Sequence, residues 1–214
     1  MPLLEPAVAL TDLGLALENA VFAALLARRA RHAVLQRWFL VFFSSLALAA
    51  LMGFVSHGFI ADKTTGLHTV VWTVILLAIG TVALAASAIG ARLLWPAATA
   101  LRVTRAAAML GILYTVVILA GYRFFVTAIA FYLPATLFLL TALVIHDHRT
   151  PAAHLRAGII GMFLTLVAAL VQQAKIGLHP VYFDHNALYH LIQAVALLLV
   201  YLAARGLLRS ESPA

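Results

Sequence analysis

Residues 67–88 read LHTVVWTVILLAIGTVALAASA and contain no Asp, Glu, Lys or Arg. A helix needs about 20 apolar residues to cross the hydrocarbon core of a bilayer, and this stretch is long enough to do so. The run is also continuous, whereas the strands of a membrane β-barrel alternate apolar and polar residues in segments of about 10. We therefore predict a membrane-spanning helix here.

Six further stretches have the same character, so the sequence predicts seven spans. Their approximate limits are Leu10–Ala27, Trp38–Phe59, Leu67–Ala88, Ala97–Ala120, Phe124–Ile145, Leu155–Ala174 and Ala187–Ala204. No linker separates a second domain, and we expect residues 1–214 to form one all-α domain, a polytopic seven-transmembrane-helix bundle. Six spans with one buried, non-spanning segment is the alternative.

The composition agrees with a membrane protein. Apolar residues make up 65% of the chain and charged residues 10%, whereas a soluble domain is about 45–50% apolar and about 25% charged. The absence of cysteine excludes a disulfide framework and a Cys-based metal site. The net charge is +7, but the basic residues lie in short clusters between apolar runs, so we expect no nucleic-acid partner.

The distribution of Lys and Arg predicts the orientation. Eleven of them follow the odd-numbered spans and three follow the even-numbered ones. The eleven are Arg28, Arg29, Arg31, Arg37, Arg92, Arg102, Arg105, Arg149, Arg156, Arg205 and Arg209, and the three are Lys63, Arg123 and Lys175. Because basic loops stay in the cytoplasm, we expect the N-terminus outside and the C-terminus in the cytoplasm.

Four histidines fall at the outer end of this predicted bundle. His57 closes the second span in GFVSHGF, and His68 opens the third in GLHTVVW. His185 and His190 open the seventh span in FDHNALYHLIQ. Polar groups inside a membrane are costly and are candidates for function. Three histidines with an open fourth position suit catalytic zinc, and hydrogen bonding between helices is the alternative.

The seventh span has one polar face. Asn186, His190 and Gln193 are spaced i, i+4 and i+7 and should point into the bundle. His185 lies about 140° around the helix from His190 and would join them only from a distorted first turn. Other polar residues expected near this end are Glu18, Asn19, Gln172 and Gln173.

These features resemble the CREST superfamily of membrane hydrolases, which includes alkaline ceramidases, progestin and adipoQ receptors and hemolysin III-like proteins. The shared features are the seven spans, His57 at the end of the second and the polar motif that opens the seventh. FDHNALYHLIQ and the HGF at residues 57–59 are more closely similar to a bacterial family of small seven-span membrane proteins. The resemblance implies a location in the bacterial cytoplasmic (inner) membrane.

The resemblance also implies a zinc site. In the ceramidase-like pattern, three histidines hold zinc, while a Ser four residues before the span-two His and an Asp eleven after it position water. His57 and His190 match that pattern. The Ser position is Gly53, the Asp position is His68, and the first His of the span-seven pair is Asn186.

The implied metal ligands are His57, His68, His185 and His190. His68 and Glu18 are the implied catalytic groups, and Asn186, Gln193 and Asp184 would support the ligands. Glu18 is the carboxylate expected at sufficient depth to act as a general base, with Asp62 and Asp184 at the rim. Binding by all four histidines would make a closed, structural zinc site.

Three functions compete at this point. The first is a zinc-dependent hydrolase of a lipid amide or ester, with membrane lipid as partner and substrate. The second is a non-catalytic membrane sensor or transporter with a polar outer pocket. The third is a redox protein that holds haem without covalent attachment, with His57 and His190 as axial ligands.

Overall fold

The computed structural model describes residues 2–28, 34–179 and 182–210. This part of the chain contains seven α-helices and no strand. The helices are α1 (Pro6–Ala27), α2 (Val34–Phe59), α3 (Gly66–Leu94), α4 (Ala97–Leu119), α5 (Phe125–Arg149), α6 (Ala153–Gln173) and α7 (His185–Ser210). Each is long and apolar enough to cross a membrane, which confirms the all-α class and the seven candidate spans. Arg29 and Arg31 lie outside the described residues.

Several helices extend beyond the apolar stretch that predicts them. The third reaches Leu94 rather than Ala88, and the fifth reaches Arg149 rather than Ile145. Hydrogen bonding continues through the polar residues that follow each apolar run, so hydropathy underestimates helix length. The third helix ends just before Pro96, since a residue that precedes proline disfavours the helical region.

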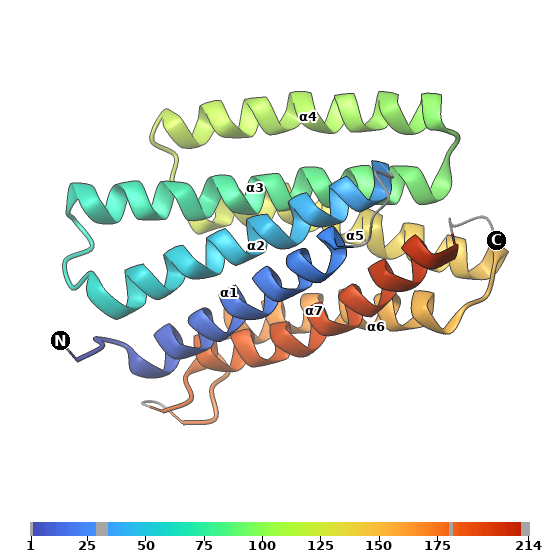
Figure 1. Ribbon diagram of the computed structural model, residues 1–214. Helices are drawn as coiled ribbons and strands as arrows, with labels where there is room; N and C mark the ends of the chain where they lie inside the picture. Colours follow the sequence, from blue (N-terminus) through green and yellow to red (C-terminus); the bar gives the residue numbers. More distant parts are fainter. Residues whose placement is uncertain (1, 29–33, 180–181, 211–214) are drawn as a thin grey trace.

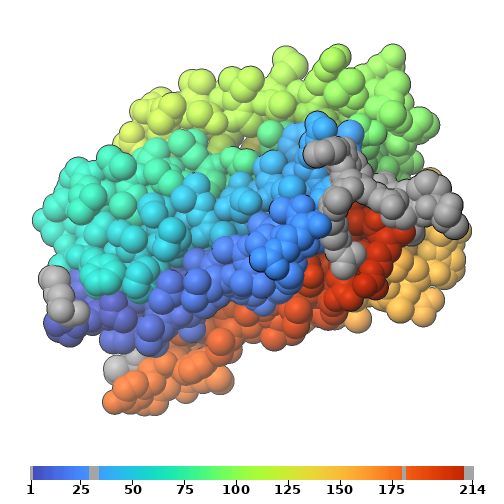
Figure 2. Space-filling model, viewed as in Figure 1, coloured from blue at the N-terminus to red at the C-terminus, as the bar shows by residue number. Residues whose placement is uncertain are grey.

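The helices form an elongated bundle with the two chain ends at opposite ends (Figure 1). The closest helix pairs are α6 with α7 and α1 with α2, while α1 also contacts α7. The fourth helix packs against α3 at the edge of the bundle, and its outer side is bare of other helices (Figures 1 and 2). In the seven-span arrangement that side would face lipid.

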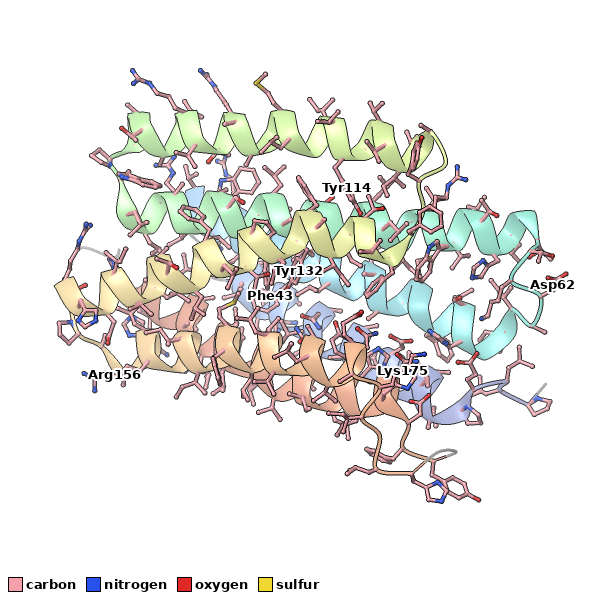
Figure 3. The ribbon with its side chains drawn as sticks, turned by 180° about the vertical axis from the view of Figure 1, so that it is seen from behind. Phe43, Asp62, Tyr114, Tyr132, Arg156 and Lys175 are labelled. Carbon is pink, nitrogen blue, oxygen red and sulfur yellow. The ribbon has the colours of Figure 1, made fainter. Side chains whose placement is uncertain are left out.

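Three aromatic side chains pack together in the half of the bundle where α1 ends and α2 begins. Phe22 stacks on Tyr201 with ring centroids 4.4 Å apart, and Phe22 meets Phe43 edge-on at 5.6 Å. We call these three residues the aromatic layer; Figure 3 shows Phe43 near the middle of the bundle. The remaining half, around the start of α1 and α7, contains the buried polar groups described next.

Candidate functional site

A polar cavity of about 380 Å³ lies between α1, α2, α3 and α7. Its polar lining residues are Asp12, Asn19, His57, Gln172, Asn186, His190 and Gln193. Its aromatic lining residues are Trp72, Phe125 and Tyr189. Asn19 comes one helical turn before Phe22, and Leu197, which also lines the cavity, comes one turn before Tyr201. The aromatic layer therefore lies about one helical turn beyond the lining of the cavity on that side.

Asp12 and His190 form the central contact of the cavity. The Nε2 atom of His190 lies 3.2 Å from Oδ1 of Asp12, and its Nδ1 atom lies 2.9 Å from Oγ1 of Thr11. Asp12 is 5% exposed and His190 is 8% exposed. Both ring nitrogens of His190 thus lie within hydrogen-bonding distance of oxygens on α1, which joins α1 to α7.

Asp12 also packs against α2 at Gly53. A Cβ atom at position 53 would lie 2.7 Å from Oδ1 of Asp12 and 2.8 Å from its Cγ and Oδ2. No side chain fits between them, so the carboxylate of Asp12 requires glycine on the facing helix. The prediction from the family resemblance assigns no role to Asp12. It names Glu18 as the carboxylate that lies deep enough in the bundle to act as a general base.

His57 pairs with a different acid. Its Nδ1 atom lies 2.6 Å from Oε2 of Glu5, and the N–H of Glu5 donates to the carbonyl of His57 at 3.1 Å. Lys63 lies 3.9 Å from the other oxygen of Glu5. These contacts hold the segment before α1 against the end of α2, at the rim of the cavity.

Asn19 and Gln193 contribute two buried amides. The Nδ2 group of Asn19 donates to the carbonyl of Leu15 at 2.8 Å, and Nε2 of Gln193 donates to Oγ1 of Thr165 at 3.4 Å. The predicted polar face of α7 is present in the cavity lining, since Asn186, His190 and Gln193 all belong to it. Sequence spacing was sufficient to find that face.

The other predicted site residues lie outside this lining. The N–H of His68 donates to Oγ1 of Thr65, the N-terminal cap of α3, so His68 lies in the first turn of this helix. Its ring stacks on Trp72, with ring centroids 6.1 Å apart. Asp184 accepts hydrogen bonds from the N–H groups of Asn186 and Ala187, at 3.0 and 2.9 Å. Asp184 is thus the N-terminal cap of α7.

His185 follows that cap as the first residue of α7, and neither it nor Glu18 belongs to the cavity lining. At the rim, Asp62 lies in the loop between α2 and α3. The hydroxyl and the N–H of Thr64 both donate to Oδ1 of Asp62, and these bonds lower the pKa of its carboxyl. This exposed group belongs to the loop and not to the cavity.

The geometry gives the predicted zinc site no support. Among the described residues, no group of three or more His, Cys, Asp or Glu side chains is placed to hold a metal ion. Both nitrogens of His190 and one of His57 already have protein partners. These residues therefore do not fit zinc as they are arranged, nor do they offer His190 as an axial ligand for haem. The binding of zinc and the binding of haem therefore stay predictions from the sequence.

A second cavity, which we call the apolar cavity, adjoins the first. Its volume is about 460 Å³, and residues of α5 and α6 make up most of its lining. Tyr132 lines it from the middle of α5 (Figure 3). The two cavities have a common wall, formed by Leu46, Ile79, Phe125, Gln172, Tyr189 and Gln193. A polar and an apolar space thus lie side by side.

Comparison with known proteins gives one match. The sequence model described as a family of unknown function, DUF6962, matches residues 7–209. No curated protein and no solved structure matches the chain. The resemblance to the CREST superfamily therefore stays a prediction.

Proposed function

The chain belongs to DUF6962, a family of unknown function, and we propose that it is a membrane protein that binds an amphipathic molecule of the bilayer. The polar head of this molecule would occupy the polar cavity, and its chain would occupy the apolar cavity. The protein would act as a sensor or carrier for it. The observation that carries this proposal is that the two cavities adjoin and have six lining residues in common.

The chemistry of the two spaces supports an amphipathic ligand. The polar cavity contains a carboxylate, two imidazoles and several amides, which suit a head group that forms hydrogen bonds. The apolar cavity is lined mainly by aliphatic and aromatic side chains of α5 and α6. An alkyl chain in the bilayer is already out of water, so its affinity for this space would come from close packing with these side chains and from the contacts of the head group.

The apolar cavity has a route to the membrane. Three of its lining residues, Leu133, Leu137 and Leu170, are 39%, 45% and 69% exposed. They lie on α5 and α6, within stretches apolar enough to be in the hydrocarbon core. A ligand dissolved in the bilayer would enter sideways between these two helices.

The aromatic layer supports a binding role over an open pore. Its stacked and edge-on rings lie beyond the polar cavity, toward the other end of the bundle. With the N-terminus outside, as the Lys and Arg distribution favours, the head group would lie at the depth of the outer leaflet. A carrier would have to open this layer to pass its ligand on.

The test is photo-crosslinking of a dodecanol that carries a diazirine on its alkyl chain, in lipid nanodiscs. We expect labelled peptides from the apolar lining of α5 and α6. Ala169→Trp would put an indole ring into the space of the alkyl chain and should reduce this labelling by about 10-fold, which corresponds to about 1.4 kcal/mol of lost binding.

The control is Ala107→Trp. It puts the same side chain into a separate cavity of about 560 Å³ between α3, α4 and α5, and it should leave labelling of α6 unchanged. Labelling restricted to the outer side of α4, or equal labelling of the wild type and Ala169→Trp, would overturn the proposal.

A further inference from the structure

The cavity of about 560 Å³ between α3, α4 and α5 is long, and we call it the α4 groove. Its lining extends along α4 from Val103 to Val117. Over that stretch the helix rises about 21 Å, at about 1.5 Å per residue. One leaflet contributes about 15 Å to a hydrocarbon core of about 30 Å. An acyl chain of one leaflet can therefore lie in the α4 groove over its full length.

The α4 groove has a buried floor and an open side. Tyr114, on its floor, is 6% exposed, whereas Leu110 and Leu113 in the same lining are 58% and 59% exposed. The Tyr114 hydroxyl donates to the carbonyl of Leu76 on α3 at 2.9 Å (Figure 3). Its ring stacks on Phe131 of α5, with centroids 4.6 Å apart. This stack joins α4 to α5 and leaves the space beside it open to the bilayer.

The interior of the α4 groove suits an alkyl chain. Its lining is mostly aliphatic and aromatic, with three hydroxyl groups, on Ser87, Tyr114 and Thr127. The hydroxyl of Ser87 donates to the carbonyl of Ala83 at 2.9 Å, and that of Tyr114 is bonded to Leu76. Since two of the three hydroxyls already donate within the protein, the interior has little to offer a polar group.

Basic side chains lie at one end of the α4 groove. Val103 and Ala106 line it, and Arg102 and Arg105 directly precede them in the chain. Both arginines are exposed. The apolar lining on α4 thus begins where the two guanidinium groups are attached, as in a site for a molecule with an apolar chain and an anionic head.

Arg149 brings a third guanidinium group to this end from α5. Its Nη1 donates to the carbonyl of Leu94, the last residue of α3, at 3.3 Å. The next residue, Trp95, stacks on Phe138 of the groove lining, with centroids 5.9 Å apart. A guanidinium group has five N–H donors, so one bond to Leu94 leaves others for a phosphate.

This end carries positive charge without a matching negative charge. Among the described residues, Arg102, Arg105 and Arg149 form no ion pair with a carboxylate. Asp147, the acid nearest to Arg149 along the chain, pairs with Arg156, with Nε and Oδ2 3.4 Å apart. Basic pockets between membrane helices bind anionic lipid head groups. The charge of this end therefore complements a lipid phosphate.

We propose that the α4 groove binds one phospholipid with a negatively charged head group. One acyl chain lies along α4 between α3 and α5, and the phosphate lies at Arg102, Arg105 and Arg149. The juxtaposition of an apolar groove of acyl-chain length with three arginines at its end carries the proposal. The site is separate from the polar and apolar cavities, so it does not depend on the proposed function.

The experiment is native mass spectrometry of the full chain, released from nanodiscs with equal amounts of phosphatidylglycerol and phosphatidylcholine. The two lipids carry the same acyl chains, and only the first has a net negative charge. We expect one phosphatidylglycerol per chain to be retained over phosphatidylcholine by about 10-fold. A basic residue near an anionic head group contributes about 5-fold in affinity, and the three arginines share one phosphate.

Two variants test the head-group end. Arg102→Gln and Arg149→Gln should each lower the preference for phosphatidylglycerol by about 3- to 5-fold, because each removes one positive charge. Arg209→Gln is the matched control. Arg209 is an exposed arginine at the same end of the bundle, but it lies on α7, which does not line the α4 groove (Figure 1).

A second pair of variants tests the acyl-chain end. Ala107→Trp puts an indole ring into the α4 groove and should abolish retention of either lipid. Ile112→Trp puts the same ring on the outer side of α4, at a residue 66% exposed, and should leave retention unchanged. Thermal unfolding in phosphatidylcholine nanodiscs shows which variants fold, and the two exposed arginine variants test the site even where Ala107→Trp does not fold.

Four outcomes would overturn the proposal. They are equal retention of the two lipids by the wild type, an unchanged preference in both arginine variants, full retention in a folded Ala107→Trp, and displacement of the lipid by glycerol 3-phosphate, which would indicate a site for a free phosphate. A lipid-free dimer that Ala107→Trp converts to a monomer would assign the α4 groove to a second copy of the chain instead.

Discussion

The carboxylate of Asp12 lies in the space that a side chain at Gly53 would need. A Cβ atom there would be 2.7 Å from Oδ1 of Asp12, well inside any allowed contact. At this level of the cavity the polar group therefore comes from α1, while α2 contributes a glycine.

The first prediction concerns this contact. Gly53→Ala would force the Asp12 carboxylate away from His190 and should lower the free energy of unfolding by about 1–3 kcal/mol, the usual penalty for overpacking. Weaker labelling by the diazirine-bearing dodecanol should accompany it. The measurement is thermal unfolding of the variant in nanodiscs, with the labelling assay run on the same preparation.

Gly14→Ala is the matched control. Gly14 lies on α1, and a Cβ atom added there would meet nothing within 4 Å. Replacing an exposed helical glycine by alanine stabilises a helix by about 0.5–1 kcal/mol. We expect Gly14→Ala to raise the unfolding temperature slightly, and equal behaviour of the two variants would contradict the packing of Asp12 against α2.

The second prediction concerns the Asp12–His190 pair. Removing one partner of a buried pair leaves an uncompensated polar group and costs about 3–5 kcal/mol, whereas removing both costs less than the sum. Asp12→Ala and His190→Ala should each destabilise the protein strongly, and the double variant should be only slightly worse than either. Additive losses, measured by unfolding of all three variants, would show that the two side chains do not interact.

The third prediction concerns metal content. Because His57 is paired with Glu5 and His190 with Asp12, we expect the purified protein to contain well under one zinc per chain. Elemental analysis of the wild type beside His57→Ala and His190→Ala is the measurement. Near-stoichiometric zinc in the wild type that disappears in both variants would instead establish a metal centre across α2 and α7, and would revive the lipid hydrolase hypothesis.

Much of the fold could be predicted because a segment that crosses a bilayer has to be apolar, helical and long enough to span it. A continuous apolar run such as residues 67–88 has to be helical, and its length fixes the span to within a few residues. The polar face of α7 followed from helical spacing in the same way. These are local properties, and they require no knowledge of how the helices pack.

The partners of the histidines could not be predicted, because they depend on packing. Topology places His57 and His190 at one depth, but it does not say that the segment before α1 brings Glu5 to the first and that α1 brings Asp12 to the second. One signal for Asp12 was present in the sequence. It is an acid inside an apolar stretch, seven residues before Asn19 on the same helical face, and intramembrane carboxylates are rare.

The last prediction tests orientation, and the absence of native cysteine makes it simple. Thr64 and Thr150 are both exposed, in the loops that follow α2 and α5. The distribution of Lys and Arg along the chain predicts that Thr150 is in the cytoplasm and Thr64 outside. On intact cells, a membrane-impermeant maleimide should label Thr64→Cys but not Thr150→Cys, and both should react after permeabilisation. The reverse pattern would invert the bundle and move the polar cavity to the cytoplasmic leaflet, and labelling of both variants in intact cells would contradict the odd number of spans between Thr64 and Thr150.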